Sequence, residues 1–221
     1  MEKNVYSLVL LDELVDAVDK LAYERCTSRS NLVNQILAEY LSFSTPEDRI
    51  RDIFGDMEKL FADLDGFQFR EQPSETMVSV RSALHYRYRP TVRYVLELYR
   101  RWEPYMGELR ISVRTQNEDL LRLIRNYFQI WNTMENQWIG QYFPGGAVPC
   151  EIHPGRCTRR LRLPKGKESD SSRKIAQAIL QYIRGFDSGM KTYFAGLEDP
   201  DETERRLEFD YRNHLKHSVI L

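Results

Sequence analysis

Two spacings of apolar residues recur along this chain, and each predicts a different kind of element. From residue 5 to residue 10 the side chains fall alternately on two faces, as in a short β-strand. One face carries Tyr6, Leu8 and Leu10, and the other carries Val5, Ser7 and Val9. Asp12 and Glu13 then open a helical spacing, with acidic residues where the helix dipole favours them. Thr27 interrupts this helix, and Ser28 is the predicted N-cap of a second one.

This first segment is too small to fold alone. A single strand leaves its backbone N–H and C=O groups unpaired, and about forty residues cannot enclose a core. Two copies satisfy both needs if their strands pair antiparallel across a two-fold axis and their helices close over the inner strand face. The pattern therefore predicts a homodimer.

The same stretch resembles a known DNA-binding family. From Tyr6-Ser-Leu-Val-Leu-Leu-Asp-Glu-Leu14 through Thr27-Ser-Arg-Ser-Asn-Leu-Val33, strand, spacing, cap and helix stripes together resemble the ribbon-helix-helix family of Arc, MetJ and CopG type. The resemblance covers roughly the first fifth of the chain and does not extend to the second domain. It implies a dimer whose two-stranded ribbon enters the major groove of double-stranded DNA.

The resemblance also assigns roles by position. The outward strand residues would contact base edges, and the start of the second helix would hold a phosphate. The implied base-contacting positions are Val5, Ser7 and Val9, with Lys3 as the nearby cation. The implied phosphate-contacting positions are Ser28, Arg29, Ser30 and Asn31. Among the three outward strand residues, only Ser7 offers a hydrogen bond to a base.

Charge is distributed unevenly along the chain, although the net charge is only −1. Residues 1–43 hold four basic residues (Lys3, Lys20, Arg25, Arg29) against seven acidic ones (Glu2, Asp12, Glu13, Asp16, Asp19, Glu24, Glu39). The acidic excess continues to residue 75, so the remaining chain is net basic. This leaves an alternative open, in which the N-terminal module only dimerises and the rest binds a protein partner.

The rest of the chain predicts a second, α+β domain. A capped helix from Pro46 to about Leu64 either links the two domains, lengthens the dimer interface, or does both. Beyond residue 76 a period of two predicts an antiparallel meander, and later helical stripes predict helices that back this small sheet. The predicted divisions are 1–43 (ribbon-helix-helix), 44–70 (connecting helix) and 71–221 (α+β domain). The predicted strands are 77–84, 92–99, 108–114 and 159–163, and the predicted helices are 117–131, 171–186 and 199–217.

Two basic features of the second domain are candidate nucleic-acid contacts. A run without acids contains Arg156, Arg159, Arg160 and Arg162, which would add phosphate contacts outside the ribbon or simply protect a strand edge from aggregation. Tyrosine and arginine alternate between residues 86 and 101. This alternation fits a stacking platform for single strands, an effector pocket, or the polar outer face of a half-buried sheet.

A cysteine- and histidine-containing loop is a candidate metal site. Cys150, His153 and Cys157 are spaced C-x₂-H-x₃-C, and thiolates with imidazole suit zinc, nickel or copper. A fourth ligand would come from His214 or His217. The alternative is two ordinary loop cysteines and surface histidines.

Other features exclude several classes of protein. We expect a cytoplasmic protein, because no apolar run approaches the roughly 20 residues of a membrane span and three scattered cysteines do not form a disulfide framework. Without a recognisable nucleophile–base pairing, phosphate loop or carboxylate dyad, we predict no enzyme and no cofactor. The sequence favours a homodimeric transcriptional regulator that acts as a repressor, assembles into dimers or tetramers, and senses a small molecule. An antitoxin or mobile-element accessory protein is a close variant.

Overall fold

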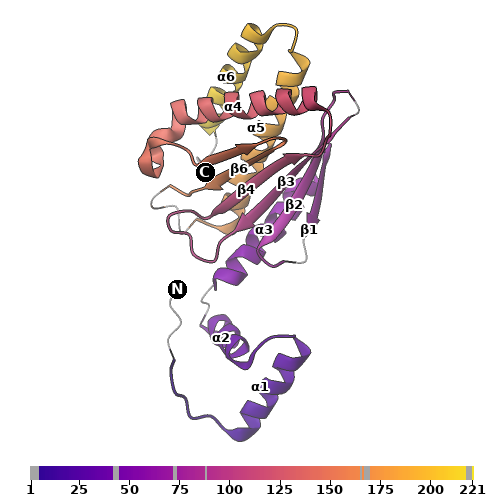
Figure 1. Ribbon diagram of the computed structural model, residues 1–221. Coiled ribbons are helices and arrows are strands. Elements are labelled where there is room, and N and C mark those ends of the chain that lie inside the picture. The colour runs from indigo at the N-terminus through magenta and orange to yellow at the C-terminus, as the bar shows by residue number, and fades with distance from the viewer. Residues whose placement is uncertain are drawn as a thin grey trace. The chain divides into compact units, whose positions relative to one another are not determined.

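The computed structural model describes residues 5–41, 45–71, 74–87, 89–164, 166, 170–217 and 221. Contacts between Cα atoms divide the chain into two compact units, Met1–Arg49 and Ile50–Leu221. Within the described residues there are six α-helices and one six-stranded antiparallel sheet (Figure 1). The predicted α+β class is therefore confirmed.

The smaller unit contains two helices joined by a tight turn, α1 (Asp12–Glu24) and α2 (Arg29–Tyr40). Ser28 caps α2 as predicted, because its side chain accepts a hydrogen bond from the Asn31 N–H. The strand predicted over residues 5–10 is not confirmed. Residues 5–10 precede the Leu11 N-cap of α1 without regular structure, and no other described part of the chain pairs with them.

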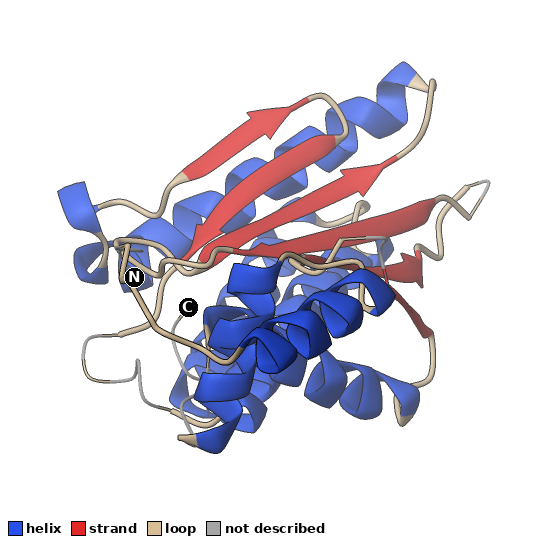
Figure 2. Cartoon of the chain, turned by 90° about the horizontal axis from the view of Figure 1, so that it is seen from below, coloured by secondary structure: helices blue, strands red, loops and turns tan. Residues whose placement is uncertain are grey.

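The larger unit is built on the sheet, whose strand order is β1-β2-β3-β4-β6-β5. The strands fan out through the twist of the sheet (Figure 2). The predicted meander corresponds to β2, β3 and β4, and β6 corresponds to the predicted fourth strand. The strands β1 and β5 were not predicted. The bounds are β1 Phe67–Glu71, β2 Met77–Ala83, β3 Thr91–Leu98, β4 Gly107–Val113, β5 Cys150–His153 and β6 Arg156–Leu161.

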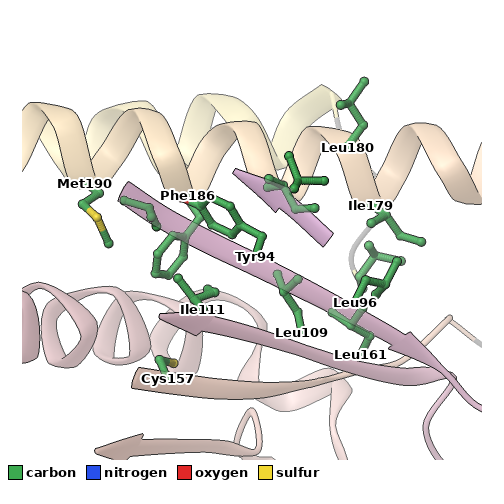
Figure 3. Close-up of a cluster of buried hydrophobic side chains, with 14 of the residues drawn as sticks. Tyr94, Leu96, Leu109, Ile111, Cys157, Leu161, Ile179, Leu180, Phe186 and Met190 are labelled. Carbon is green, nitrogen blue, oxygen red and sulfur yellow. The ribbon is translucent and has the colours of Figure 1, made fainter. Parts of the chain in front are cut away.

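Helices cover one face of this sheet. The side chains of α5 (Ser172–Ala195) meet those of β3, β4 and β6 in a buried apolar layer (Figure 3). The same core includes residues of α3 (Pro46–Ala62), α4 (Glu118–Ile139) and α6 (Pro200–His217), so α3 is more than a connection. Two short 3₁₀ turns, η1 (Gly140–Tyr142) and η2 (Pro144–Gly146), follow α4.

The opposite face of the sheet is open. Along β3 and β4 every second residue is buried and the residues between them are partly exposed. A side-chain period of two places these partly exposed residues on the face away from α5. Within the described residues, no helix combines the length and the apolar composition that crossing a membrane requires.

Candidate nucleic-acid interface

The smaller unit exposes an unusual amount of apolar surface. Of the fourteen large hydrophobic residues that the structure describes as exposed, twelve lie between residues 5 and 41. They are Val5, Tyr6, Leu8, Val9, Leu10, Leu11, Leu14, Tyr23, Ile36, Leu37, Tyr40 and Leu41. Among the described residues of this unit, only Ala22, Leu32 and Ala38 are buried. Such a concentration marks an interaction surface, because single chains rarely leave large apolar patches in water.

The predicted base-contacting residues are fully accessible in the single chain. Val5 is 100% exposed and Val9 is 102% exposed, and Ser7 between them is also exposed. On the other strand face Leu10 is 43% exposed. Lys3 lies outside the described residues. In the single chain, Val5, Ser7 and Val9 are therefore accessible to a ligand.

The predicted phosphate site at the start of α2 has a more constrained geometry. The Ser28 Oγ accepts the Asn31 N–H at 3.3 Å, so this backbone donor is already used. Arg29 forms an ion pair with Asp19 of α1, with its Nε 2.5 Å from the Asp19 Oδ1 and its Nη2 on the other oxygen. The hydrogen bond from Arg29 lowers the pKa of Asp19. Ser30 is exposed. A phosphate here would share Arg29 with Asp19.

Arg159 is not a nucleic-acid contact, which corrects the prediction from the basic run. Its side chain is only 1% exposed, because it lies on the helix-covered face of β6. There it donates to the Glu135 carboxylate of α4, and its guanidinium lies 4.5 Å from the centre of the Tyr182 ring. Alternation along a strand sends neighbouring arginines to opposite faces, so one basic run cannot form one patch.

The other members of the basic run remain on the surface. Arg156 and Arg160 are exposed on the open face of the sheet. Arg160 lies over the Tyr105 ring at 5.4 Å. Arg162 is partly exposed, and its Nη1 donates to the Tyr142 main-chain oxygen at 2.5 Å. Of the four arginines, Arg156 is the one whose side chain projects from the open face with no described ion pair, hydrogen bond or ring contact.

The structure brings two of the three predicted metal ligands together and places the third on the other face of the sheet. Cys150 and Cys157 lie on the helix-covered face of β5 and β6, with their sulfurs 3.0 Å apart. The hydrogen bond between the two thiols, together with burial, raises the pKa of Cys157. His153 lies on the opposite face, since it pairs with Arg156 across the strands. Among the described residues, no three His, Cys, Asp or Glu side chains are placed to hold a metal ion.

The tyrosine–arginine alternation forms the two faces of β3, as expected for a half-buried sheet. Tyr94 points into the core, where its hydroxyl donates to the Asp187 Oδ1 at 2.8 Å. Arg93 points to the open face. Tyr99 follows the strand, and burial together with its hydrogen bond to Glu108 raises its pKa to about 12. Since Tyr94 is buried, the described part of the pattern does not form a row of exposed aromatic rings.

A hollow of about 520 Å³ between α4, α5 and α6 is the main candidate for an effector site in the larger unit. Trp131 and Tyr211 supply aromatic surface, while Arg184, Asp210 and His214 supply charge. Burial and the nearby Arg184 lower the pKa of His214. The lining is therefore more polar than that of most small-ligand pockets, which are predominantly apolar.

No family model matches this chain, and no curated protein or solved structure matches it either. Its function must therefore be inferred from sequence and geometry.

Proposed function

We propose that this protein is a homodimeric, sequence-specific DNA-binding regulator whose paired N-terminal segments form a two-stranded ribbon. The observation that carries the proposal is the apolar surface of residues 5–41, where twelve of the fourteen exposed large hydrophobic residues gather. The occupant we assign to that surface is a second copy of the same segment. The proposal includes the contacts expected from the sequence: Lys3 as a cation beside the ribbon, and a phosphate held by Ser28, Arg29, Ser30 and Asn31.

Backbone hydrogen bonding supports a second copy over an unrelated partner. Residues 5–10 take part in no described backbone hydrogen bond, although backbone donors and acceptors are stable only when paired or hydrated. Antiparallel pairing with an identical segment pairs these groups and turns Tyr6, Leu8 and Leu10 toward the helices of both copies. Burying apolar surface yields roughly 25 cal/mol per Å², so this face provides a substantial driving force for dimerisation.

The same pairing leaves Val5, Ser7 and Val9 on the outside of the ribbon. Two strands of this kind fit the major groove, where valine methyl groups can pack against thymine and a serine hydroxyl can bond to a base edge. The repressor role rests on the sequence resemblance alone. The second candidate function, a dimerisation clip that binds a protein partner, is favoured by the acidic character of residues 1–43.

Selection from a random library of DNA duplexes tests this proposal. We expect the full chain to enrich a two-fold symmetric sequence. Ser7→Ala should reduce discrimination at one base position by about fivefold, since a single base hydrogen bond is worth about 1 kcal/mol. Arg29→Ala should instead weaken binding to all duplexes alike. Ser188→Ala, at an exposed serine of α5, is the matched control. A library that shows no enriched sequence would favour the dimerisation clip.

A further inference from the structure

One row of side chains crosses the open face of the sheet from edge to edge. Strand register places six residues side by side, one from each strand, and we call them the polar row. Its members are Gln68, Arg81, Arg93, Ser112, Arg156 and His153 in spatial order. At a strand spacing of about 4.8 Å the row is roughly 24 Å long. Every member can donate a hydrogen bond, and none is acidic.

The charges of the polar row are not compensated within the described part of the protein. Arg81 lies directly opposite Arg93, and like charges in this relationship destabilise a sheet. No ion pair joins Arg81, Arg93 or Arg156 to any described carboxylate. The Nε of Arg93 is buried without a hydrogen-bond partner. The row is therefore arranged to receive an anion from outside.

The neighbouring positions on the same face are different. Arg110 is held by two carboxylates, through ion pairs with Glu97 and with Glu108, the latter at 2.9 Å. The hydroxyl of Tyr99 also bonds to Glu108. Charge around Arg110 is therefore balanced, whereas no described ion pair balances the three arginines of the polar row.

The row is accessible, and its chemistry favours a phosphate backbone over bases. Gln68, Arg156 and His153 are exposed, and Arg81 and Arg93 are partly exposed. The side-chain types in the row, arginine, glutamine and serine, are those that contact phosphate and sugar oxygens in protein–DNA complexes. Apart from the His153 imidazole at one end, the row offers no aromatic ring for base stacking, which single-strand binding surfaces depend on.

We propose that the polar row binds the phosphate backbone of double-stranded DNA without regard to sequence. The proposal rests on the proposed function for the identity of the polyanion, and it assigns the second domain a direct role in DNA affinity. The polar row takes the place of the four arginines at 156, 159, 160 and 162 as the expected additional phosphate contact. Of those four, only Arg156 belongs to the row. The ribbon would select the sequence, and the row would strengthen binding to any duplex.

The test is duplex binding by the full chain, measured from 50 to 300 mM salt. The triple variant Arg81→Gln, Arg93→Gln, Arg156→Gln should reduce the slope of log K against log salt by about two to three units, since each lost phosphate contact contributes about 0.9. Affinity for all duplexes should fall by at least tenfold at low salt. The matched control is Arg173→Gln, Arg205→Gln, Arg206→Gln, which removes the same charge from exposed helical positions.

A conservative variant separates charge from folding. The triple variant Arg81→Lys, Arg93→Lys, Arg156→Lys should retain most of the salt dependence, because an ammonium group still contacts phosphate. The proposal is overturned if the glutamine triple and the control triple have the same salt slope. It is also overturned if the glutamine triple weakens binding only to single-stranded DNA or RNA.

The outcome is independent of the ribbon. If wild-type protein prefers no sequence but the glutamine triple still reduces the salt slope, the proposed sequence-specific function fails and the polar row stands. If a preferred sequence is found and the glutamine triple leaves the slope unchanged, the polar row fails and the ribbon stands.

Discussion

Arg159 and Glu135 form an ion pair that is sealed inside the larger unit. The Arg159 Nε lies 2.9 and 3.1 Å from the two carboxylate oxygens, and each side chain is 1% exposed. The Arg159 Nη2 also donates to the Leu221 main-chain oxygen at 2.5 Å. The pair thus joins β6 to α4 and to the last residue of the chain. Removing either partner would leave the other as an uncompensated charge in a nonpolar environment, which destabilises the folded state.

Removing one partner of this pair should be costly. We expect Arg159→Met to lower the free energy of unfolding by about 3–5 kcal/mol in urea titrations at pH 7.5, since Glu135 is left charged and buried. The exposed neighbour gives the control, and Arg160→Met should change stability by less than about 0.5 kcal/mol. Equal effects of the two substitutions would contradict the burial of Arg159.

The same variant should respond to pH in a defined direction. Burial raises the pKa of Glu135 even with Arg159 in place. A carboxyl group with a raised pKa in the folded state binds protons more readily when folded, so its penalty grows as pH rises and shrinks as pH falls. The stability deficit of Arg159→Met relative to wild type should therefore be smaller at pH 5 than at pH 7.5. A deficit that does not change with pH would show that Glu135 is not the stranded group.

Two glycines in helices should give opposite results when replaced by alanine. A Cβ at Gly189 of α5 would lie 2.7 Å from Trp131 and from the Tyr127 hydroxyl, so Gly189→Ala should destabilise the larger unit by about 1–3 kcal/mol. A Cβ at Gly55 of α3 meets nothing within 4 Å. Gly55→Ala should therefore stabilise the protein by about 0.5–1 kcal/mol. Thermal unfolding measures both, and a stabilising Gly189→Ala would contradict the close packing of α4 on α5.

His214 should make the protein less stable in mild acid. Burial and Arg184 lower its pKa from the ordinary 6.5, so the folded state favours the neutral imidazole. Protonation is then easier in the unfolded chain, and stability falls as pH drops through about 6.5. His214→Gln should flatten the dependence of unfolding free energy on pH between 7 and 5. An unchanged pH dependence would mean that His214 titrates equally in both states.

Local signals in the sequence were sufficient for much of the fold. Ser28, Asn117 and Ser171 each accept a backbone hydrogen bond at the start of a helix, and each stands before a clear apolar stripe. Alternation likewise located the central strands. The strand β1 was missed because Phe67–Glu71 is short and follows directly after Gly66, although its Phe-Gln-Phe-Arg alternation was a usable signal.

The candidate sites could not be predicted fully, because they depend on contacts between residues that are far apart in the sequence. The partner of Arg159 is 24 positions away, on a part of α4 beyond the predicted end of that helix at residue 131. His153 was grouped with Cys150 and Cys157 because all three are close in sequence. In the sheet, however, the two cysteines lie on the helix-covered face and His153 lies on the open face. The polar row could not be predicted, because it requires the register of all six strands.

The most direct test of the ribbon compares two adjacent residues that pairing would place on opposite faces. In the proposed dimer Leu8 faces the helices, whereas Val9 faces DNA. We predict that Leu8→Asp gives monomers in sedimentation experiments and loses specific DNA binding. Val9→Asp should remain a dimer yet bind the selected duplex at least tenfold more weakly than wild type. If wild-type protein sediments as a monomer, or if Val9→Asp binds the selected duplex as tightly as wild type, the ribbon does not read DNA.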